Sequence, residues 1–412
     1  MSDEILFLAH RMPFPPDRGD KIRSHHILKA LAELAPVHVA TFADDDRDIA
    51  EEAALAGVAR SYRLVRRVKP LLLAGFQALL RHEPVSLPAF HSADLARYVA
   101  GVLRDHPVST IYVFSGQMGQ YIPEDYAGRV IFDFVDVDSA KFEAYAQSHS
   151  GIRRCLEARE AQLLSIEEAR LARRSAVSLL VSAAEAALFA GRLAPIDRAA
   201  CDIRALGNGI DSQMFDSAAV KPEPSMLQCA GPRLIFTGQM DYAPNVAAVL
   251  RVVQRILPLI RAQLPTASFH VVGRNPGKLV AALDGVNGCH IWGSVADMRP
   301  WLSAADLALV PLEIARGIQN KVLEAMAMGL PVVLTSGAAT GIGATPGKHF
   351  AVADSDEDLA AGCIALLSQP RKARAIGQEA RQYVVNEMSW QAMLAPLDSL
   401  LKLPGCPVRH AA

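Results

Sequence analysis

The chain has 412 residues, a length that exceeds one ordinary hydrophobic core and predicts two or three domains. Hydrophobic residues make up 51% of the sequence and charged residues 21%, which is typical of a globular protein and excludes long disordered segments. The net charge of −1 excludes a general electrostatic attraction to nucleic acid, so an anionic ligand would need a local group of cations.

The cysteines and the amino terminus indicate the cellular compartment of the protein. Six cysteines are scattered singly, without the close pairs of a zinc site or the density of a disulfide scaffold: Cys155, Cys201, Cys229, Cys289, Cys363 and Cys406. The opening residues MSDEILFLAH are acidic where a signal peptide is basic, and no apolar run reaches the roughly 18 residues of a membrane span. We therefore expect a cytoplasmic protein that does not cross a membrane.

Short apolar and β-branched runs alternate with helical patterns, which predicts parallel sheets covered by helices on both faces. The predicted strands are 4–10, 37–43, 110–115, 130–135 and 177–182, followed by 233–238, 268–273, 306–312 and 331–336. Between the two series, residues 216–232 are rich in Pro and small residues and predict a linker. The expected fold class is α/β, with two doubly wound, Rossmann-like domains facing a ligand-binding cleft.

The stretch HRMPFPPDRGDKIRSHHILKAL, residues 10–31, follows the first predicted strand and enters a helix at Gly19. Lys21 and Arg23 fall in the first turn of this helix, where the helix dipole disfavours cations. A bound anion would offset that cost. Alternatively, both side chains point into water, and the residues alone leave the two interpretations open.

Two segments stand apart from the alternation of strands and helices. Residues 59–82, ARSYRLVRRVKPLLLAGFQALLRH, combine a basic stretch with a leucine-rich stretch, which fits a segment lying on an anionic membrane surface; the basic stretch carries Arg60, Arg63, Arg66, Arg67 and Lys69. The alternative is a basic loop followed by a core helix, because Pro70 interrupts a single amphipathic helix. Residues 151–174 carry opposite charges at helical spacing and predict a long helix with a solvated face.

Asp136 and Asp138 follow the predicted strand 130–135 in the motif FDFVDVDS. Because they lie two residues apart at a strand end, their carboxylates project from the same side and can share a divalent cation. The alternative is that these acids cap the next helix or face the cleft. Beyond this pair the sequence shows no group of metal ligands.

Residues 309–336, LVPLEIARGIQNKVLEAMAMGLPVVLTS, contain a strand, a polar loop and a helix of about eight residues that stops at Gly329. Such a loop offers the free N–H groups of the helix start to an anion, and Lys321 lies beside them. Glu324 lies one turn into the helix, where its carboxylate can accept hydrogen bonds from hydroxyls. A nucleoside diphosphate with its sugar would suit this arrangement. Alternatively, Glu324 is an ordinary acid favoured by the helix dipole.

Three motifs together resemble the family-four retaining glycosyltransferases of the GT-B fold: VLEAMAMGLPVV, NGID at 208–211 and FTGQMDYAPNV at 236–246. The resemblance covers nearly the whole chain. The opening stretch 10–31, with DVDSAKF and RGIQNKVLEAMA, is similar to the glycosyltransferases associated with the PEP-CTERM/exosortase system of bacteria that make exopolysaccharide. The resemblance implies an acceptor-side domain 1–215, the linker 216–232, a donor-binding domain 233–385, and residues 386–412 with a helix that packs back toward the amino-terminal domain.

The resemblance also implies the roles of particular residues. In that family two glutamates spaced Glu-x7-Glu contact the donor; Glu324 matches the second, and Arg316 stands where the first is expected. The implied donor-binding residues are Gly238, Arg316, Asn320, Lys321 and Glu324. Arg316 and Lys321 would stabilise the departing nucleoside diphosphate, and Asp136 or Asp138 would accept the proton of the attacking hydroxyl. Gly19, Lys21 and Arg23 would meet donor phosphate or a phosphate-bearing acceptor.

The expected function is transfer of a sugar from a nucleotide-sugar donor to a glycan or lipid-linked acceptor, with retention and in exopolysaccharide biosynthesis. No metal and no cofactor is expected, and nucleic acid is not an expected partner. Peripheral contact with the inner face of the plasma membrane through residues 59–82 is the open alternative noted above. Two other functions fit the same fold: a sugar-nucleotide epimerase, and a non-catalytic assembly partner at the membrane.

Overall fold

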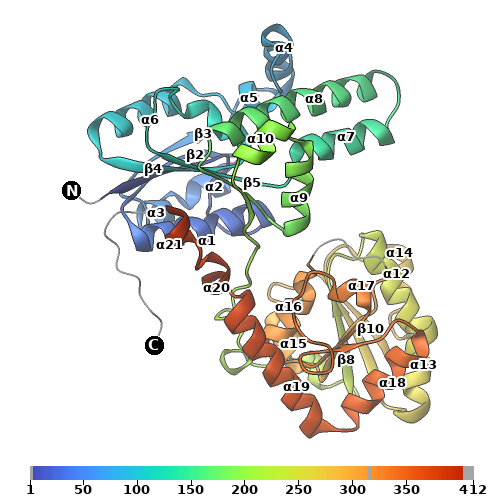
Figure 1. Ribbon diagram of the computed structural model, residues 1–412. Coiled ribbons are helices and arrows are strands. Elements are labelled where there is room, and N and C mark those ends of the chain that lie inside the picture. The colour runs from blue at the N-terminus through green and yellow to red at the C-terminus, as the bar shows by residue number, and fades with distance from the viewer. Residues whose placement is uncertain (1–2, 314–317, 402–412) are drawn as a thin grey trace. The chain divides into compact units, whose positions relative to one another are not determined.

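The computed structural model describes residues 3–313 and 318–401. By their internal contacts these residues form two compact units, one of residues up to 208 together with those from 393 onward, and one of residues 209–392. Each unit is an α/β domain built on a parallel sheet (Figure 1). The expected α/β class with two doubly wound domains is therefore confirmed.

In the described part of the first unit, seven parallel strands lie in the order β3-β2-β1-β4-β5-β6-β7. Their bounds are β1 Glu4–Ala9, β2 Val37–Ala43, β3 Ser61–Arg66, β4 Val108–Phe114, β5 Arg129–Val135, β6 Val177–Leu180 and β7 Ile203–Ala205. The central strands are buried along their whole length, because helices cover both faces of a parallel sheet.

The helices of the first unit lie between these strands, except for the last, which comes from the other end of the chain. They are α1 Gly19–Leu34, α2 Asp46–Ala50, α3 Glu52–Ala56, α4 Leu71–Arg81, α5 Ser86–Ala89, α6 Ala93–Asp105, η1 Gly116–Tyr121, α7 Asp138–Ser148, α8 Gly151–Arg174, α9 Ala183–Arg192, α10 Pro195–Ala200 and α21 Leu397–Leu401. α7 and α8 pack against each other as a hairpin of helices (Figure 1).

In the described part of the second unit, six parallel strands lie in the order β10-β9-β8-β11-β12-β13. Their bounds are β8 Arg233–Thr237, β9 Ser268–Val272, β10 Cys289–Gly293, β11 Leu307–Val310, β12 Val332–Leu334 and β13 Ala351–Val352. The order reverses direction between β8 and β11, so the loops that follow these two strands diverge. Such a point is where doubly wound domains bind ligands.

The helices of the second unit are α11 Pro224–Leu227, α12 Ala243–Arg251, α13 Leu257–Gln263, α14 Lys278–Ala281, α15 Arg299–Ala304, α16 Asn320–Ala327, α17 Ser336–Ala339, α18 Asp356–Leu367 and α19 Pro370–Tyr383; short η segments lie at Ser217–Ala219, Val252–Ile256, Val286–Gly288 and Val384–Met388. Among the described residues, one helical run, Ala243–Gln263, is long and apolar enough to cross a membrane. Half of the most apolar stretch of this run is buried, and the run packs against α18, as a core helix does.

The boundary between the units differs from the prediction. The expected first domain ends at 215, but the structure assigns residues 209–215 to the second unit. The predicted linker 216–232 also belongs to the second unit, where Met226 is fully buried and the N–H of Glu223 donates to the carbonyl of Pro300 at 2.9 Å. This segment is therefore anchored to the body of the unit despite its Pro-rich composition.

The carboxyl-terminal segment divides between the two units. Residues 386–392 belong to the second unit and residues from 393 onward to the first, so the helix α20, Trp390–Leu394, spans the boundary. Further along, α21 packs against α1, and the guanidinium of Arg129 donates to the carbonyl of Leu400 at 2.6 Å. The chain therefore crosses between the units twice, near 208 and near 392.

Candidate functional site

The loops after β8 and β11 bring together four residues of the second unit. Gly238 directly follows β8, and the chain after β11 leads into α16, which carries Lys321 and Glu324. Asn245, near the start of α12, supplies the fourth side chain. The resemblance had implied three of the four, and Asn245 is an addition that lies in the quoted motif FTGQMDYAPNV.

Gly238 is a glycine because its neighbours leave no room for a side chain. A Cβ at this position would lie 2.9 Å from Nδ2 of Asn245 and 3.0 Å from Nζ of Lys321. Gly273, at the end of β9, is just as confined, since its Cβ would lie only 1.6 Å from the carbonyl oxygen of Gly238. The sequence reasoning did not single out Gly273, although a glycine directly after a predicted strand was a usable signal.

Lys321 is held as a cation at the start of α16. Its Nζ donates to Oδ1 of Asn245 at 2.6 Å and lies 4.3 Å from the ring centre of Phe236. Asn245 is itself held by donation from its Nδ2 to the carbonyl of Gln239 at 2.8 Å. Burial lowers the pKa of Lys321 to about 8, while Glu324 acts in the opposite direction. The site therefore carries a partly desolvated ammonium, which is a strong partner for an anion.

Glu324 lies one helical turn from Lys321. Burial raises the pKa of its carboxyl group, and the charge of Lys321 lowers it. Burial and the charge of Lys321 are the two influences on this carboxyl group among the described residues, and a carboxylate at this place can accept hydrogen bonds. Asn320, the first residue of α16, is exposed. Arg316 lies in 314–317, outside the described residues.

In the first unit, Lys21 and Arg23 do not point into water. Both are buried, and each is paired with a carboxylate: Nζ of Lys21 lies 2.6 Å from Oδ1 of Asp48, and the guanidinium of Arg23 forms two hydrogen bonds with Asp133 at 3.0 and 3.1 Å. Each charge is thus neutralised within the unit. Gly19 is exposed, with open space where a side chain would lie.

Arg23 is also bonded to the end of its own unit. Its third nitrogen donates to Oδ1 of Asn208 at 2.8 Å and to the carbonyl of Gly207 at 3.3 Å, and the hydroxyl of Tyr112 donates to Asp133 at 2.9 Å. With these partners the buried guanidinium has little capacity left for a phosphate. The geometry therefore supports a structural role for Arg23 in place of the phosphate contact that the resemblance implied.

Asp136 and Asp138 lie together, as their spacing predicted. The group that both carboxylates contact is a side chain of the protein, that of Lys141. Nζ of Lys141 lies 3.0 Å from Oδ1 of Asp138 and 3.6 Å from Oδ2 of Asp136. Burial lowers the pKa of Lys141, but the two carboxylates outweigh this effect and the net shift is upward. The ammonium of Lys141 thus lies between the two acids, at the position considered above for a divalent cation. The sequence analysis did not predict this role of Lys141.

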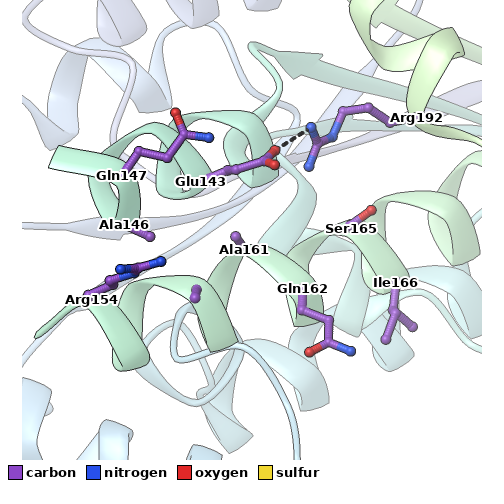
Figure 2. A pocket seen from close by; sticks show the side chains of 10 residues that line it. Glu143, Ala146, Gln147, Arg154, Ala161, Gln162, Ser165, Ile166 and Arg192 are labelled. Atoms are coloured by element: carbon purple, nitrogen blue, oxygen red, sulfur yellow. Dashed lines mark hydrogen bonds and ion pairs between the residues drawn. The ribbon is translucent and has the colours of Figure 1, made fainter. Parts of the chain in front are cut away.

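A polar groove of about 500 Å³ runs between α7 and α8, beyond the helix start at Asp138 (Figure 2). Across it, Arg192 of α9 pairs with Glu143 of α7 at 2.7 Å. Gln147 and Gln162 add amide groups from the two helices. No local sequence pattern indicates this groove, because it forms only where the two helices pack.

A second cluster of potential metal ligands lies at the opposite, amino-terminal edge of the same sheet. Glu4, His38 and His106 can bring one ligand atom each to within 4.8 Å of one another. The carboxylate of Glu4 already bonds Nε2 of His38 at 2.7 Å and Nδ1 of His106 at 3.1 Å, and the guanidinium of Arg60 lies 3.4 Å away. The three groups therefore satisfy one another within the described structure.

Residues 231–369 match the family described as glycosyl transferases group 1. They include Gly238, Asn245, Lys321 and Glu324, the four residues at the divergence of the loops. We refer to residues 231–369 as the group 1 domain after this match.

Similarity to known proteins extends beyond this domain. A GDP-mannose-dependent monoacylated alpha-(1-6)-phosphatidylinositol monomannoside mannosyltransferase of Corynebacterium glutamicum is 29% identical over 218 residues. The match covers 48% of this chain and 55% of the relative, so the chain spans about half the length of the relative it matches.

Two solved structures match this chain over almost its whole length. Anabaena Alr3699/HepE in complex with UDP has a TM-score of 0.62 at 14% identity and covers 97% of this chain and 99% of its own. Sucrose-phosphate synthase of Thermosynechococcus elongatus has a TM-score of 0.58 at 16% identity and covers 97% and 98%. These likenesses show the fold, and with the two parallel sheets they confirm the expected GT-B architecture.

The first unit also buries an acid beside Asp138. Glu168 of α8, which is 7% exposed, accepts hydrogen bonds from the N–H and the hydroxyl of Ser139 at 2.9 and 2.5 Å. Burial raises its pKa to about 7, and the nearby charge of Asp138 adds to the shift, while Ser139 and Arg192 act against it. The expectation of a merely solvated helix at 151–174 was therefore incomplete: its bounds agree with α8, but Glu168 is part of the core.

We expect Glu168 to make the folded protein less stable as the pH rises. Between the ordinary carboxyl pKa and about 7, the folded state holds a proton that the unfolded state has lost, so the free energy of unfolding falls with increasing pH across this window, by up to about 3 kcal/mol. The variant Glu168→Gln carries no ionisable group and should flatten this dependence. Urea unfolding between pH 5 and 8 measures it, and an identical slope in both proteins would contradict the assignment.

Proposed function

We propose that the protein is a glycosyltransferase that moves a sugar from a nucleotide-sugar donor to a glycan or lipid-linked acceptor. The observation that carries this proposal is that Lys321, Glu324 and Gly238 lie close together where the loops after β8 and β11 diverge, inside the group 1 domain. This position offers a cation, an acceptor carboxylate and a backbone without a side chain in one place. A nucleoside diphosphate needs these three features.

The donor would lie with its diphosphate at the start of α16. There the free N–H groups of the helix and the ammonium of Lys321 would both attract phosphate oxygens, and the absence of a side chain at Gly238 would let the diphosphate approach the backbone. Glu324 would accept hydrogen bonds from the ribose hydroxyls. When the bond to the sugar breaks, the diphosphate gains negative charge, and Lys321 would stabilise that charge more than it stabilises the bound donor.

The acceptor hydroxyl must lose its proton during transfer. We propose Asp136 or Asp138 as the group that receives it, since both carboxylates are about half-exposed at the carboxyl end of β5. Lys141 would hold the two acids in place through its ion pairs with both. Because Lys321 supplies the positive charge at the donor and Lys141 lies between the acids, we propose that transfer needs neither a divalent metal nor a cofactor.

Two finer assignments complete the proposal. Retention of the configuration at the transferred sugar rests on VLEAMAMGLPVV, NGID and FTGQMDYAPNV, which resemble the family-four retaining glycosyltransferases. A role in exopolysaccharide synthesis rests on the motifs at 10–31, 136–142 and 316–327, which resemble those of exosortase-associated transferases. A lipid-linked acceptor has further support, because the mannosyltransferase of Corynebacterium glutamicum is named for a phosphatidylinositol mannoside.

The experiment is a two-stage assay on the full chain. A thermal-shift screen across nucleoside diphosphates first identifies the preferred base, since a ligand at a hundred times its Kd raises stability by about 2.7 kcal/mol. The matching nucleotide sugars are then incubated with glycan and polyprenyl-phosphate-linked sugar acceptors in the presence of a chelator. We expect a product whose formation requires the acceptor. Conversion of the donor to its epimer without an acceptor would instead identify an epimerase, and a chelator-inactivated enzyme restored by Mg²⁺ would contradict the metal-free mechanism.

A further inference from the structure

α4 exposes its large side chains and buries its small ones. Ala74 and Ala78 are fully buried against the first unit, whereas six large apolar side chains of this helix are 47–91% exposed: Leu71, Leu72, Leu73, Phe76, Leu79 and Leu80. In Figure 1 the helix stands clear of the sheet of its unit. Of the two interpretations of residues 59–82, the core helix is therefore excluded. A basic loop is excluded too, because residues 61–66 form the edge strand β3.

A surface of this kind is not explained by the folding of the unit. An ordinary surface helix packs its leucines inward and leaves small or polar residues outside. Here the orientation is reversed, and Val68, just before the helix, is 76% exposed as well. A contiguous apolar surface of this size on one helix marks a site of interaction with a partner or a membrane.

The length and composition of α4 favour a membrane surface. Its 11 residues are too few to span a bilayer, which needs about 20, but they are enough to lie in its interface. The exposed side chains are aliphatic apart from Phe76, and α4 lacks the Tyr and Trp residues that are typical of protein interfaces. Aliphatic side chains without hydrogen-bonding groups suit an acyl-chain environment.

The charges around α4 suit an anionic surface. Residues 59–82 contain six Lys and Arg and no Asp or Glu. Arg81 ends the helix with its side chain 61% exposed and 3.8 Å from the carboxylate of Glu83, and Arg66 pairs with the exposed Asp46 at 2.6 Å. Ion pairs this exposed contribute little, so either guanidinium can exchange its carboxylate for a lipid phosphate.

We propose that α4 inserts its leucine-rich face into the surface of an anionic lipid bilayer, with Arg66 and Arg81 contacting the phosphate headgroups. The helix would bind in the plane of the interface without crossing the membrane. This inference does not depend on the donor site, because α4 belongs to the first unit and shares no residue with the group 1 domain.

The test measures co-sedimentation of the full chain with vesicles of phosphatidylglycerol and phosphatidylethanolamine, and with vesicles of neutral phosphatidylcholine. Wild type should bind the anionic vesicles, and Leu72→Gln with Leu79→Gln should weaken that binding at least about tenfold. The matched control is Ile196→Gln with Leu188→Gln, which changes two exposed apolar residues of the same unit, 79% and 42% exposed, away from α4. The control should bind as wild type does.

Three outcomes would overturn the proposal. Wild type that binds neither vesicle, or binds both equally, contradicts an anionic membrane as the partner. Equal binding by the α4 variant and the control contradicts α4 as the contact. A dimer in sedimentation velocity that only the α4 variant loses, without vesicle binding, would show that a second copy of the chain covers the helix. Because these variants leave the group 1 domain unchanged, their affinity for nucleoside diphosphate should equal that of wild type, so a missing donor site is detected separately.

Discussion

The variant Lys321→Ala should lower the turnover number of the proposed transfer by about two orders of magnitude, the usual effect of removing one group that stabilises developing negative charge. It should also weaken binding of the nucleoside diphosphate. The ammonium of Lys321 is held by Asn245 and by the ring of Phe236, so its position is fixed before the donor binds. Since its pKa is about 8, affinity should fall as the pH rises through that value.

Removing the charge of Lys321 should not destabilise the fold. Burial lowers the pKa of Lys321, which means that the folded protein disfavours the charged form relative to the unfolded chain. Lys321→Met should therefore keep or raise the melting temperature at pH 7 while abolishing the cation. A charged side chain that lowers the stability of the fold and lies at a candidate anion site is typical of a residue that serves function.

Two further variants separate the roles within the donor site. Glu324→Gln should weaken nucleotide binding by roughly 1–3 kcal/mol, because a charged acceptor becomes neutral, and should affect turnover less than Lys321→Ala does. Lys348→Ala, which removes an exposed lysine of the same unit, is the control and should match wild type in both measurements. Calorimetric titration and initial rates decide the matter. Wild-type turnover in Lys321→Ala, or wild-type affinity in Glu324→Gln, would contradict the proposed placement of the donor.

The variant Asp133→Asn should destabilise the first unit by about 3–5 kcal/mol, since it leaves the buried guanidinium of Arg23 without its counter-charge. The double variant Arg23→Met with Asp133→Leu should recover most of this loss, because it removes both charges together. The control is Asp94→Asn, which breaks the exposed pair with Arg63 and should cost less than about 1 kcal/mol. Urea unfolding followed by circular dichroism compares the four proteins.

The outcome also distinguishes structure from ligand binding at Arg23. If Arg23 served mainly to bind a phosphate, Asp133→Asn would free it, and stability would change little while anion affinity rose. A small loss of stability with tighter binding of nucleoside diphosphate would therefore contradict the structural role that the buried geometry supports.

The sequence predicted the strands that the fold buries and missed those at the edges or of only a few residues. All nine predicted strands are present, because strands buried on both faces are continuous apolar runs. The four missed strands among the described residues are short or partly exposed: β3 is half-exposed and carries two arginines, β10 is mostly part-buried, and β7 and β13 have only three and two residues. Such segments lack the pattern on which strand prediction depends.

The candidate site was predictable where one segment carried its chemistry. Lys321 and Glu324 lie on one helix, and the loop before that helix predicted an anion site at the helix start. Partners distant in the sequence could not be predicted. Arg23 pairs with Asp133, which lies 110 positions away, and no local pattern indicates which of many acids a buried cation will pair with. Lys141 was near at hand in the motif DVDSAKF, but its distance from each carboxylate depends on how the chain turns into α7.

The two crossings of the chain near 208 and 392 constrain the order in which the protein can fold during synthesis. The first unit is finished only by α21, whose Leu397, Leu400 and Leu401 are at most 3% exposed, although the rest of that unit leaves the ribosome on the order of ten seconds or more earlier. Until then the nascent unit lacks the cover that α21 gives to α1, while the second unit has already emerged in full. α21 therefore completes the packing of the first unit. A chain that ends before Leu397 would leave the hydrophobic surface under α21 exposed, where chaperones can recognise it.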